Sequence, residues 1–473
     1  MAAVSRITLK RLFCKYGKNV AISRNTVRTI LSDAYYCHNK WAERLQTSIL
    51  QKVNIDDFAV KLQEKYDREK LMNAVDMDIL ANKFEQLSRK QLDFAQSLFY
   101  KFRHTNECLK VSESTHHALV RALLELQEYD RLWEILKDKI NYGVFLDCYV
   151  ANILMDHFIK KEMYYEAALV AYDMMLQEDF THPLSRALSW YACHLRWRNP
   201  PATMEEVTEQ EQQEEEDEDE EEKVIKVPFI ENPWYDDHFD IPKEMQLLGK
   251  TLTMVTREEA NLLGRSYMLI GWGLYEKFER GLELLAQWVE SDEDKAVCQE
   301  ALTDFHNRLE NVETKEAPAE QKPPGVIQLE DLLPFVTPEQ KTEYLERLQV
   351  LEEKLRSSGK IIEDFNLAEQ LQKYAADVAQ SQEQTDISQQ VALFDAWNEK
   401  RQELVDEQIA EFRRSLKRKE IEKRLEELRE QELRLTFFEN KERIRLMMKR
   451  GKQVQELEEL FQSEEYLHWS QRP

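Results

Sequence analysis

The chain has 473 residues, a formal net charge of -25 and 33% charged residues, with only 10 glycines and 12 prolines. Few turn-formers and many Leu, Glu, Lys and Arg residues predict an all-α protein of long helices joined by short loops. The six cysteines have no paired spacing, which argues against a secreted disulfide framework, and the longest apolar stretch, residues 267–275, is far shorter than the ~18 residues of a membrane span.

The first 32 residues are basic and amphipathic. Seven Lys and Arg residues precede Asp33, which is the first acidic residue of the chain, and Leu9, Leu12 and Phe13 recur at helical spacing. An Arg-rich and acid-free start of this kind is typical of a mitochondrial transit peptide. A basic RNA-binding tail is the alternative interpretation. We therefore expect residues 1–32 to be a transit peptide and the protein to act in the mitochondrial matrix.

Residues 33–200 have the pattern of consecutive amphipathic helices with an internal repeat. The clearest unit runs from Asp147 to about Gln177, with a first apolar helix, a polar turn at Lys160–Glu162 and a second helix that opens at Ala167. A similar outline lies upstream, where the second-helix position Leu132 precedes Ala167 by 35 residues. This period predicts a solenoid of helix–turn–helix units, each burying its apolar face on the next.

Two segments interrupt the helical pattern. Residues 201–244 contain an acidic run, Glu205–Glu222, with 13 carboxylates and no base, followed by a segment rich in proline and aromatic residues; we expect them to be disordered and extended, respectively. Further helical repeats are expected at 245–312, a linker at 313–337 and C-terminal helices at 338–473. The string Thr337-Pro338-Glu339-Gln340 has the pattern of a helix cap and first turn.

The C-terminal region is dense in charge. Residues 388–462 contain no proline and one glycine, which predicts one or two very long helices. Leu425, Leu428, Leu433 and Leu435 form an interrupted apolar stripe, so a helix lying on a partner is favoured over a coiled coil. From Arg413 to Lys452 there are 15 bases and 8 acids. Such a helix can lie along a phosphate backbone or against an acidic protein, or it is simply solvated.

The clearest unit resembles the pentatricopeptide repeat. The matching positions are Asp147, Asn152, Leu154, Met155, Lys160 and Ala167. The tetratricopeptide repeat, the close competitor, requires a Trp-Leu-Gly-Tyr pattern that this unit lacks. The strings Ala34–Trp41, Tyr100–Cys108 and Tyr142–Glu162 are similar to the pentatricopeptide-repeat family of the mitochondrial small ribosomal subunit. The resemblance covers about residues 30–305, and the acidic run and the charged C-terminus depart from it.

This resemblance implies an all-α solenoid followed by a long charged C-terminal helix. It implies a structural component of the mitochondrial small ribosomal subunit that binds ribosomal RNA and neighbouring subunit proteins and supports translation. No catalysis, cofactor or small-molecule substrate is implied. The alternatives are a free mitochondrial RNA-processing or RNA-stability factor with the same repeats, and a helical scaffold that binds only protein.

The candidate RNA-binding residues fall into two groups. In pentatricopeptide repeats, one side chain of the first helix and one at the repeat boundary reach a base edge, which implies His117, Asp147 and Asn152 here. For Asn152, the alternative is a role in bridging helices. Phosphate contact needs bases at turns or in clusters. The candidates are Lys101, Arg103, Lys160, Lys161, Arg196, Arg198, Arg413, Arg414, Lys417, Arg418 and Lys419, with ordinary surface charge as the alternative.

The sequence contains no motif of enzymatic chemistry. A phosphate-binding loop, a dinucleotide-binding glycine motif and a Gly-x-Ser-x-Gly elbow are all missing. The one group of metal-ligand types is His104, Cys108, His116 and His117, whose spacing matches no common zinc pattern and which is expected to lie in a loop between helices. We therefore predict that the protein is not an enzyme and binds no metal.

Overall fold

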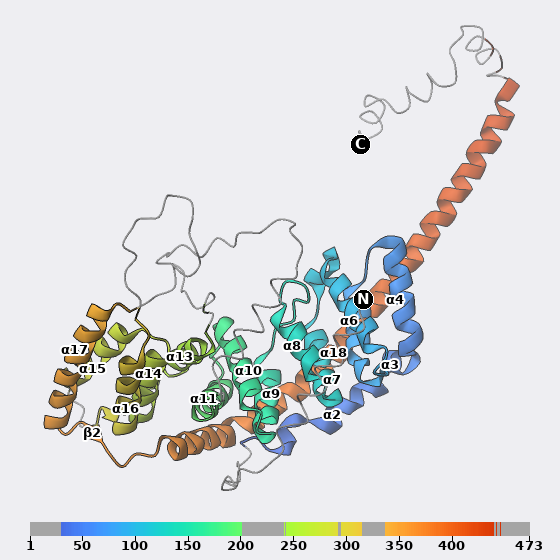
Figure 1. Cartoon of the computed structure of the whole chain (residues 1–473). Helices are drawn as coiled ribbons and strands as arrows, with labels where there is room; N and C mark the ends of the chain where they lie inside the picture. The colour runs from blue at the N-terminus through green and yellow to red at the C-terminus, as the bar shows by residue number, and fades with distance from the viewer. Residues whose placement is uncertain are drawn as a thin grey trace, which may run out of the picture. The chain divides into compact units, whose positions relative to one another are not determined.

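The computed structural model describes residues 30–200, 241, 243–291, 295–314, 336–438, 441 and 445. Residues 1–29 of the expected transit peptide, the acidic run and most of the expected linker therefore lie outside the described residues. The chain forms two compact units, residues 1–398 and 399–473, which are described separately. Figure 1 shows that the described part of the chain is almost entirely helical, as the sequence predicted.

The first unit begins with short helices and continues as helix pairs. The opening elements are η1 (Asp33–Tyr36), α2 (His38–Glu43), η2 (Arg44–Gln46), α3 (Ser48–Lys52) and α4 (Ile55–Glu69). The first helices of the pairs are α5 (Ala74–Asn82), α7 (Glu113–Leu126), α9 (Cys148–Lys160), α11 (Pro183–Arg198), α14 (Leu262–Leu274) and α16 (Gln299–Asn311). The second helices are α6 (Leu92–Arg103), α8 (Tyr129–Lys137), α10 (Tyr164–Leu176), α13 (Glu244–Val255), α15 (Phe278–Glu290) and α17 (Pro338–Ser357).

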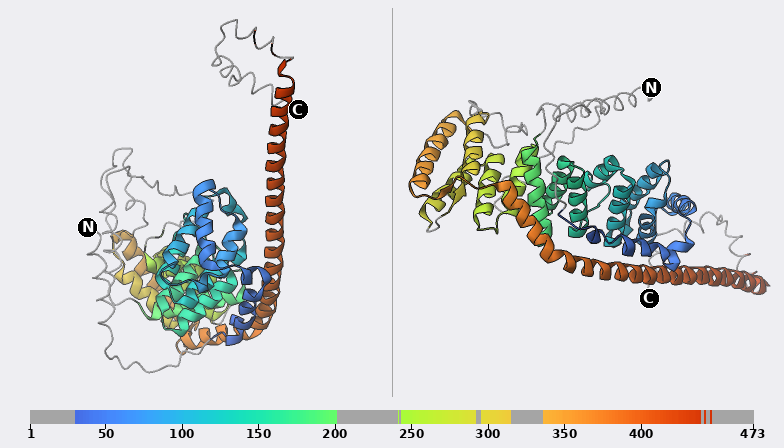
Figure 2. Two further views of the ribbon diagram at one scale, coloured as in Figure 1. Left: turned by 90° about the vertical axis from the view of Figure 1, so that its right-hand side faces the viewer. Right: turned by 90° about the horizontal axis from the view of Figure 1, so that it is seen from below.

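The helix pairs repeat at the interval that the sequence predicted. The first helices α5, α7, α9 and α11 begin at residues 74, 113, 148 and 183, which are 39, 35 and 35 residues apart. From α7 onward, each first helix packs on its own second helix, and α9 also packs on the neighbouring first helices α7 and α11. Figures 1 and 2 show the pairs following one another in chain order. The repeats therefore form a solenoid in which each unit buries apolar surface on the next.

Small elements connect the pairs. The one-turn helices η3 (Phe84–Gln86) and η4 (Asn106–Lys110) follow α5 and α6. Two short parallel strands, β1 (Val297–Cys298) and β2 (Ile361–Ile362), pair in the register Val297 with Ile361. Their pairing ties the segment before α16 to the segment after α17.

Side-chain caps fix where several helices begin. The carboxylate of Asp147 accepts from the backbone N–H of Val150 at 2.6 Å, which satisfies a free donor in the first turn of α9. The predicted cap at Thr337 is confirmed as a capping box with Gln340, with Pro338 in the first turn of α17. These local signals are readable in the sequence because each involves residues only three positions apart.

Small residues allow the helices to approach closely. Ala167 is fully buried in α10, as expected from its place at the start of a second helix. At the crossing of α13 and α14, a Cβ atom added to Gly249 would lie 2.4 Å from the backbone nitrogen of Tyr275 and 2.6 Å from the carbonyl oxygen of Gly271. Any side chain at Gly249 would therefore force these two helices apart.

The long helix α18 extends from Leu367 to Leu435. Its first part belongs to the first unit, where Leu371, Ala375 and Phe394 are buried against the repeats and residues 31–46. In Figure 2 this part runs beside the helix pairs. In the second unit, the helical residues from Gln402 onward are exposed or half-buried, and Ile409, Phe412 and Leu416 are exposed apolar side chains.

Candidate nucleic-acid interface

The N-terminal turns of α7, α9 and α11 lie together and bring three of the predicted base-reading residues to one place. We call this region the repeat edge; it contains His117, Asp147, Asn152 and His182. The Nδ1 atom of His117 lies 3.6 Å from a carboxylate oxygen of Asp147. His182 caps α11, where its Nδ1 accepts from the backbone N–H of Ser185.

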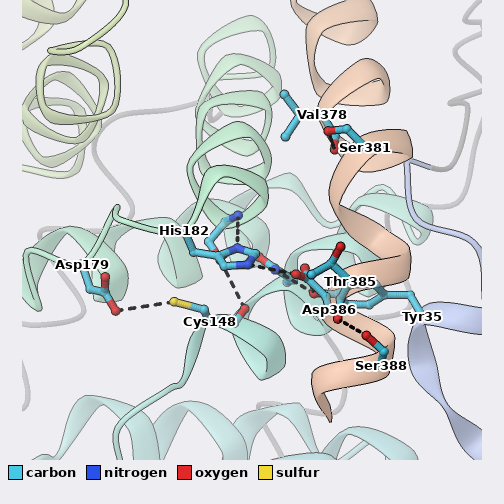
Figure 3. Close-up of polar contacts among 11 residues, drawn as sticks. Tyr35, Cys148, Asp179, His182, Val378, Ser381, Thr385, Asp386 and Ser388 are labelled. Carbon is cyan, nitrogen blue, oxygen red and sulfur yellow. Dashed lines mark hydrogen bonds and ion pairs between the residues drawn. The ribbon is translucent and has the colours of Figure 1, made fainter. Parts of the chain in front are cut away.

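A chain of hydrogen bonds covers the repeat edge. The Asn152 amide donates to the hydroxyl of Tyr35 at 2.9 Å, and this hydroxyl donates to Asp386 of α18 at 3.2 Å. The Nε2 atom of His182 lies 3.1 Å from the other oxygen of Asp386. Figure 3 shows Tyr35 and His182 approaching Asp386 from opposite sides. Asn152 and Tyr35 are fully buried, so both polar groups depend on these partners.

Aromatic rings surround His117. Its ring lies 5.0 Å from Trp41, 5.5 Å from Phe394 and 5.2 Å from Trp397, measured between centroids. The side chain is inaccessible to solvent. Burial lowers the pKa of His117, although the nearby carboxylate of Asp147 acts in the opposite direction. The structure therefore places a neutral histidine inside an aromatic box.

The N-terminal segment, residues 31–46, packs on the repeat edge. The hydroxyl of Tyr36 donates to Asp156 at 2.7 Å, and the backbone N–H of Leu31 donates to the same carboxylate at 3.3 Å. The guanidinium of Arg121 donates to the backbone carbonyl of Tyr36. Ser32 donates to Glu383 of α18 through both its backbone and its hydroxyl. The segment is therefore bonded to both the first helices and α18.

Two of the predicted phosphate contacts pair with acids of neighbouring helices. Arg196 in the last turn of α11 donates to both carboxylate oxygens of Glu244, the first residue of α13, at 2.6 and 2.8 Å. Arg198 pairs with Glu300 of α16. The first pair joins the two helices that flank residues 199–243. Trp197 is buried, so it packs in the core.

The bases at the end of α9 also have partners. Lys160 lies 2.8 Å from the buried carboxylate of Asp156 and 3.8 Å from Asp33. Lys161 is exposed, and its ammonium donates to the hydroxyl of Tyr129. Lys160 is therefore part of the packing of the N-terminal segment, whereas Lys161 remains at the surface.

The two predicted bases of α6 contact neighbouring loops and helices. Lys101 donates to the side chain of Gln63 at 2.8 Å. The guanidinium of Arg103 donates to the carbonyl of Ile140 at 3.2 Å and lines a small cavity with Cys108 and His116. Arg103 thus holds the loop that leads into α9.

The remaining predicted cluster lies on the exposed part of α18. Its five members form no ion pair with any residue in the described part of the chain, and all five are exposed. They are Arg413, Arg414, Lys417, Arg418 and Lys419, and we call them the basic cluster. Farther along the helix, bases do pair with acids, as Arg424 does with Glu427 at 3.0 Å. The basic cluster therefore presents cationic groups that are available to a ligand.

The basic cluster lies largely opposite an apolar stripe. At about 100° per residue, Arg413, Arg414, Lys417 and Arg418 share one side of α18. Val405, Ile409, Phe412 and Leu416 share the other side and are half-buried or exposed. This part of the helix is amphipathic, with one side suited to phosphate and the other to protein.

The four metal-ligand types noted in the sequence do not form a site. His116 and His117 lie in the first turn and a half of α7, so the expectation that this whole segment is a loop was wrong. The helix begins after Ser112, whose extended backbone marks the boundary. Within the described ranges, no three His, Cys, Asp or Glu side chains are placed to hold a metal ion. No described helix meets the length and hydropathy needed to cross a membrane.

Sequence reasoning missed the residues that cover the repeat edge. Asp386 and Phe394 carry no motif, whereas Tyr35 and Trp41 lie in the family-like string Ala34–Trp41, which indicated no role for either side chain. Tyr35 and Asp386 are 351 positions apart. Only the folded chain brings them together.

Comparison with known families shows which protein family the chain belongs to. The family model of the mitochondrial 28S ribosomal protein S27 matches residues 5–427. The match covers the N-terminal segment, all helix pairs, the repeat edge and the basic cluster of α18. It also agrees with the narrower resemblance that the sequence suggested. The chain therefore belongs to the mitochondrial 28S ribosomal protein S27 family.

Proposed function

We propose that this protein is a structural component of the mitochondrial small ribosomal subunit that contacts ribosomal RNA through the basic cluster of α18. Membership of the family makes the chain a mitochondrial small-subunit ribosomal protein. The RNA contact, the matrix location and the lack of catalysis are parts of the proposal. The observation that carries it is the group of five exposed bases without an acidic partner in the described part of the chain.

Phosphate binding favours cations that are not already neutralised. Contact with phosphates releases condensed counterions, and this release supplies most of the sequence-independent affinity for RNA. Arg196 is held by two charge-assisted hydrogen bonds and is 8% exposed, so its charge is already satisfied. The exposed pair between Arg198 and Glu300 is weaker and can exchange for phosphate. No acidic side chain among the described residues competes with phosphate for the basic cluster.

The repeats would act as the support for this contact. Leu367, Leu371 and Ala375 of α18 are fully buried in the first unit, and the same helix continues to Leu435. The solenoid would then bind neighbouring subunit proteins on its outer surfaces, while α18 carries the cationic groups.

The test is a salt titration of RNA binding with two five-residue variants of the full chain. In the first, Arg413, Arg414, Lys417, Arg418 and Lys419 are replaced by Gln. The matched control replaces Lys400, Lys423, Arg424, Arg429 and Arg434 by Gln, removing the same charge from the same helix. In the control set, Lys400, Arg424 and Arg434 pair with nearby Glu residues.

We expect the first variant to bind a small-subunit RNA fragment less tightly. The slope of log K against log salt should become shallower by roughly 0.7–0.9 for each phosphate that the variant no longer binds. The control should change the slope by less than the effect of about one phosphate. Equal slopes for both variants would assign the effect to net charge and refute the role of the cluster. If neither variant co-sediments with the small subunit although the salt slope of RNA binding is unchanged, the result would favour a scaffold that binds only protein.

A further inference from the structure

We propose that this protein recognises RNA by its phosphate backbone and shape, and that the repeat edge reads no base because the chain's own side chains occupy it. This inference rests on the proposed function and specifies the class of RNA recognised. Base readout needs side-chain donors and acceptors that are free to pair with a base edge. Of the predicted positions, His117 and Asn152 are buried and do not offer them, and the half-exposed Asp147 uses one carboxylate oxygen to cap α9.

Asn152 is already engaged. Its side-chain nitrogen donates to Tyr35 at 2.9 Å, and its carbonyl oxygen, although without a partner among the described residues, is shielded from solvent. Tyr35 in turn stacks on Tyr149, with ring centroids 4.8 Å apart. The hydroxyl of Tyr149 donates to the backbone carbonyl of Tyr35. A base would therefore have to displace Tyr35 from its ring stacking and its hydrogen bonds before it met Asn152.

His117 is closed on several sides. Trp41 comes from the N-terminal segment, Tyr149 from α9, and Phe394 and Trp397 from α18, all with ring centroids within 6.0 Å. Neither ring nitrogen is accessible to solvent. Rings from three elements occupy the space in which a nucleotide would stack. Readout through His117 would require two separate segments to leave the repeats together.

Asp147 has a structural role that a base would disturb. One carboxylate oxygen accepts from the backbone N–H of Val150 and caps α9, and the other faces His117. Opening the repeat edge would also expose Tyr35, Trp41 and Phe394, which are buried aromatic side chains. One hydrogen-bonded base per repeat stabilises the complex by less than this exposure costs. Binding through the basic cluster leaves the edge intact.

The first experiment compares RNAs of the same fold. The probes are one hairpin RNA and a hairpin in which base pairs and loop bases are permuted so that the fold is kept. We expect the full chain to bind both within about threefold at matched salt, because phosphates carry no sequence information. The Asn152→Ala variant should show the same ratio, and so should Asn82→Ala, a control at a buried asparagine that bonds Asp78 and Ser114. A preference of roughly tenfold or more that is lost only in Asn152→Ala would overturn the inference.

The second experiment locks the edge closed. Ser32→Cys and Glu383→Cys are introduced where the N-terminal segment meets α18, and a short bismaleimide joins them, with the linked peptides verified by mass spectrometry. The cross-linked chain should bind the hairpin within about threefold of the unlinked one. If the cross-link abolishes binding, the edge must open and the inference is wrong. Failure of every form to bind RNA at low salt would instead reject the proposed function, and the inference with it.

Discussion

Burial lowers the pKa of three histidines of the repeats. His194 in α11 is 2% exposed, and its Nδ1 contacts the hydroxyl of Tyr267 at 2.6 Å. Burial lowers the pKa of His194 from 6.5 to about 3, and the nearby Arg198 adds to the effect. Burial likewise lowers the pKa of His116 and of His157 to about 4. These side chains are therefore neutral in the folded protein.

The lowered pKa of His194 predicts sensitivity to acid. The unfolded chain takes up a proton near pH 6.5 that the folded chain resists down to about 3, so stability falls as the pH drops through this range. Between pH 7 and pH 5 the loss from His194 is on the order of 2 kcal/mol. The variant His194→Gln should lose less stability over this interval, measured by denaturant unfolding at both values. A loss equal to that of the parent chain would contradict the assignment; His104→Gln, at an exposed ring, is the control.

The hydroxyl of Tyr35 predicts a second effect on stability. Tyr35→Phe removes one group that accepts from Asn152 and donates to Asp386, leaving two buried polar groups without this partner. The expected cost is roughly 1–3 kcal/mol of unfolding free energy. Tyr344→Phe, at a half-buried tyrosine in α17, should cost far less. If thermal or denaturant unfolding shows equal effects for the two variants, the hydrogen bonds around Tyr35 are not stabilising.

At the scale of elements, helix crossings depend on glycine at defined places. Gly249→Ala puts a Cβ atom against backbone atoms of α14, the nearest at 2.4 Å, and backbone cannot give way as a side chain can. We expect a loss of about 1–3 kcal/mol in unfolding free energy. At Gly273 the nearest atom is a ring carbon of Phe305 at 3.1 Å, so Gly273→Ala should be better tolerated and gains helix propensity. The reverse order in denaturant midpoints would contradict this account of the crossing.

The long helix begins earlier than its charge pattern indicates. Sequence patterning predicted a long helix from about Ser388, whereas α18 begins at Leu367. The side chain of Asn366 accepts from the backbone N–H of Glu369 and starts the helix. Residues 367–387 are less charged than those that follow, because Leu371, Ala375 and Ala379 are buried against the repeats. A docked helix and an exposed helix differ in composition, so the rise in charge after residue 387 was interpreted as the start of the long helix.

For the whole molecule, local patterns predicted the fold and missed the covered edge. The 35-residue spacing of Leu132 and Ala167 predicted the repeats, and both side chains are fully buried in second helices. Periodicity works because each unit packs mainly on its sequence neighbours. The hydrogen bond between Tyr35 and Asp386 spans 351 positions and belongs to no period. Such contacts follow from tertiary packing alone.

The same limit applies to the candidate site. Arg196 and Arg198 were predicted as phosphate contacts, but Glu244 and Glu300, 48 and 102 positions away in the sequence, pair with them. The basic cluster was predictable, since residues 412–419 contain five bases and no acid. A run of bases on one helix can be recognised from the sequence alone, whereas the distant acid that pairs with an isolated base cannot.

The most direct test of the central claim is ultraviolet cross-linking of purified mitochondrial small subunits, followed by mass spectrometry of the peptides that carry nucleotides. The account predicts cross-links on peptides that contain residues 413–419. It also predicts none on the N-terminal segment or on residues 147–157 of the repeat edge. Nucleotides attached to the repeat edge, with none on α18, would contradict it.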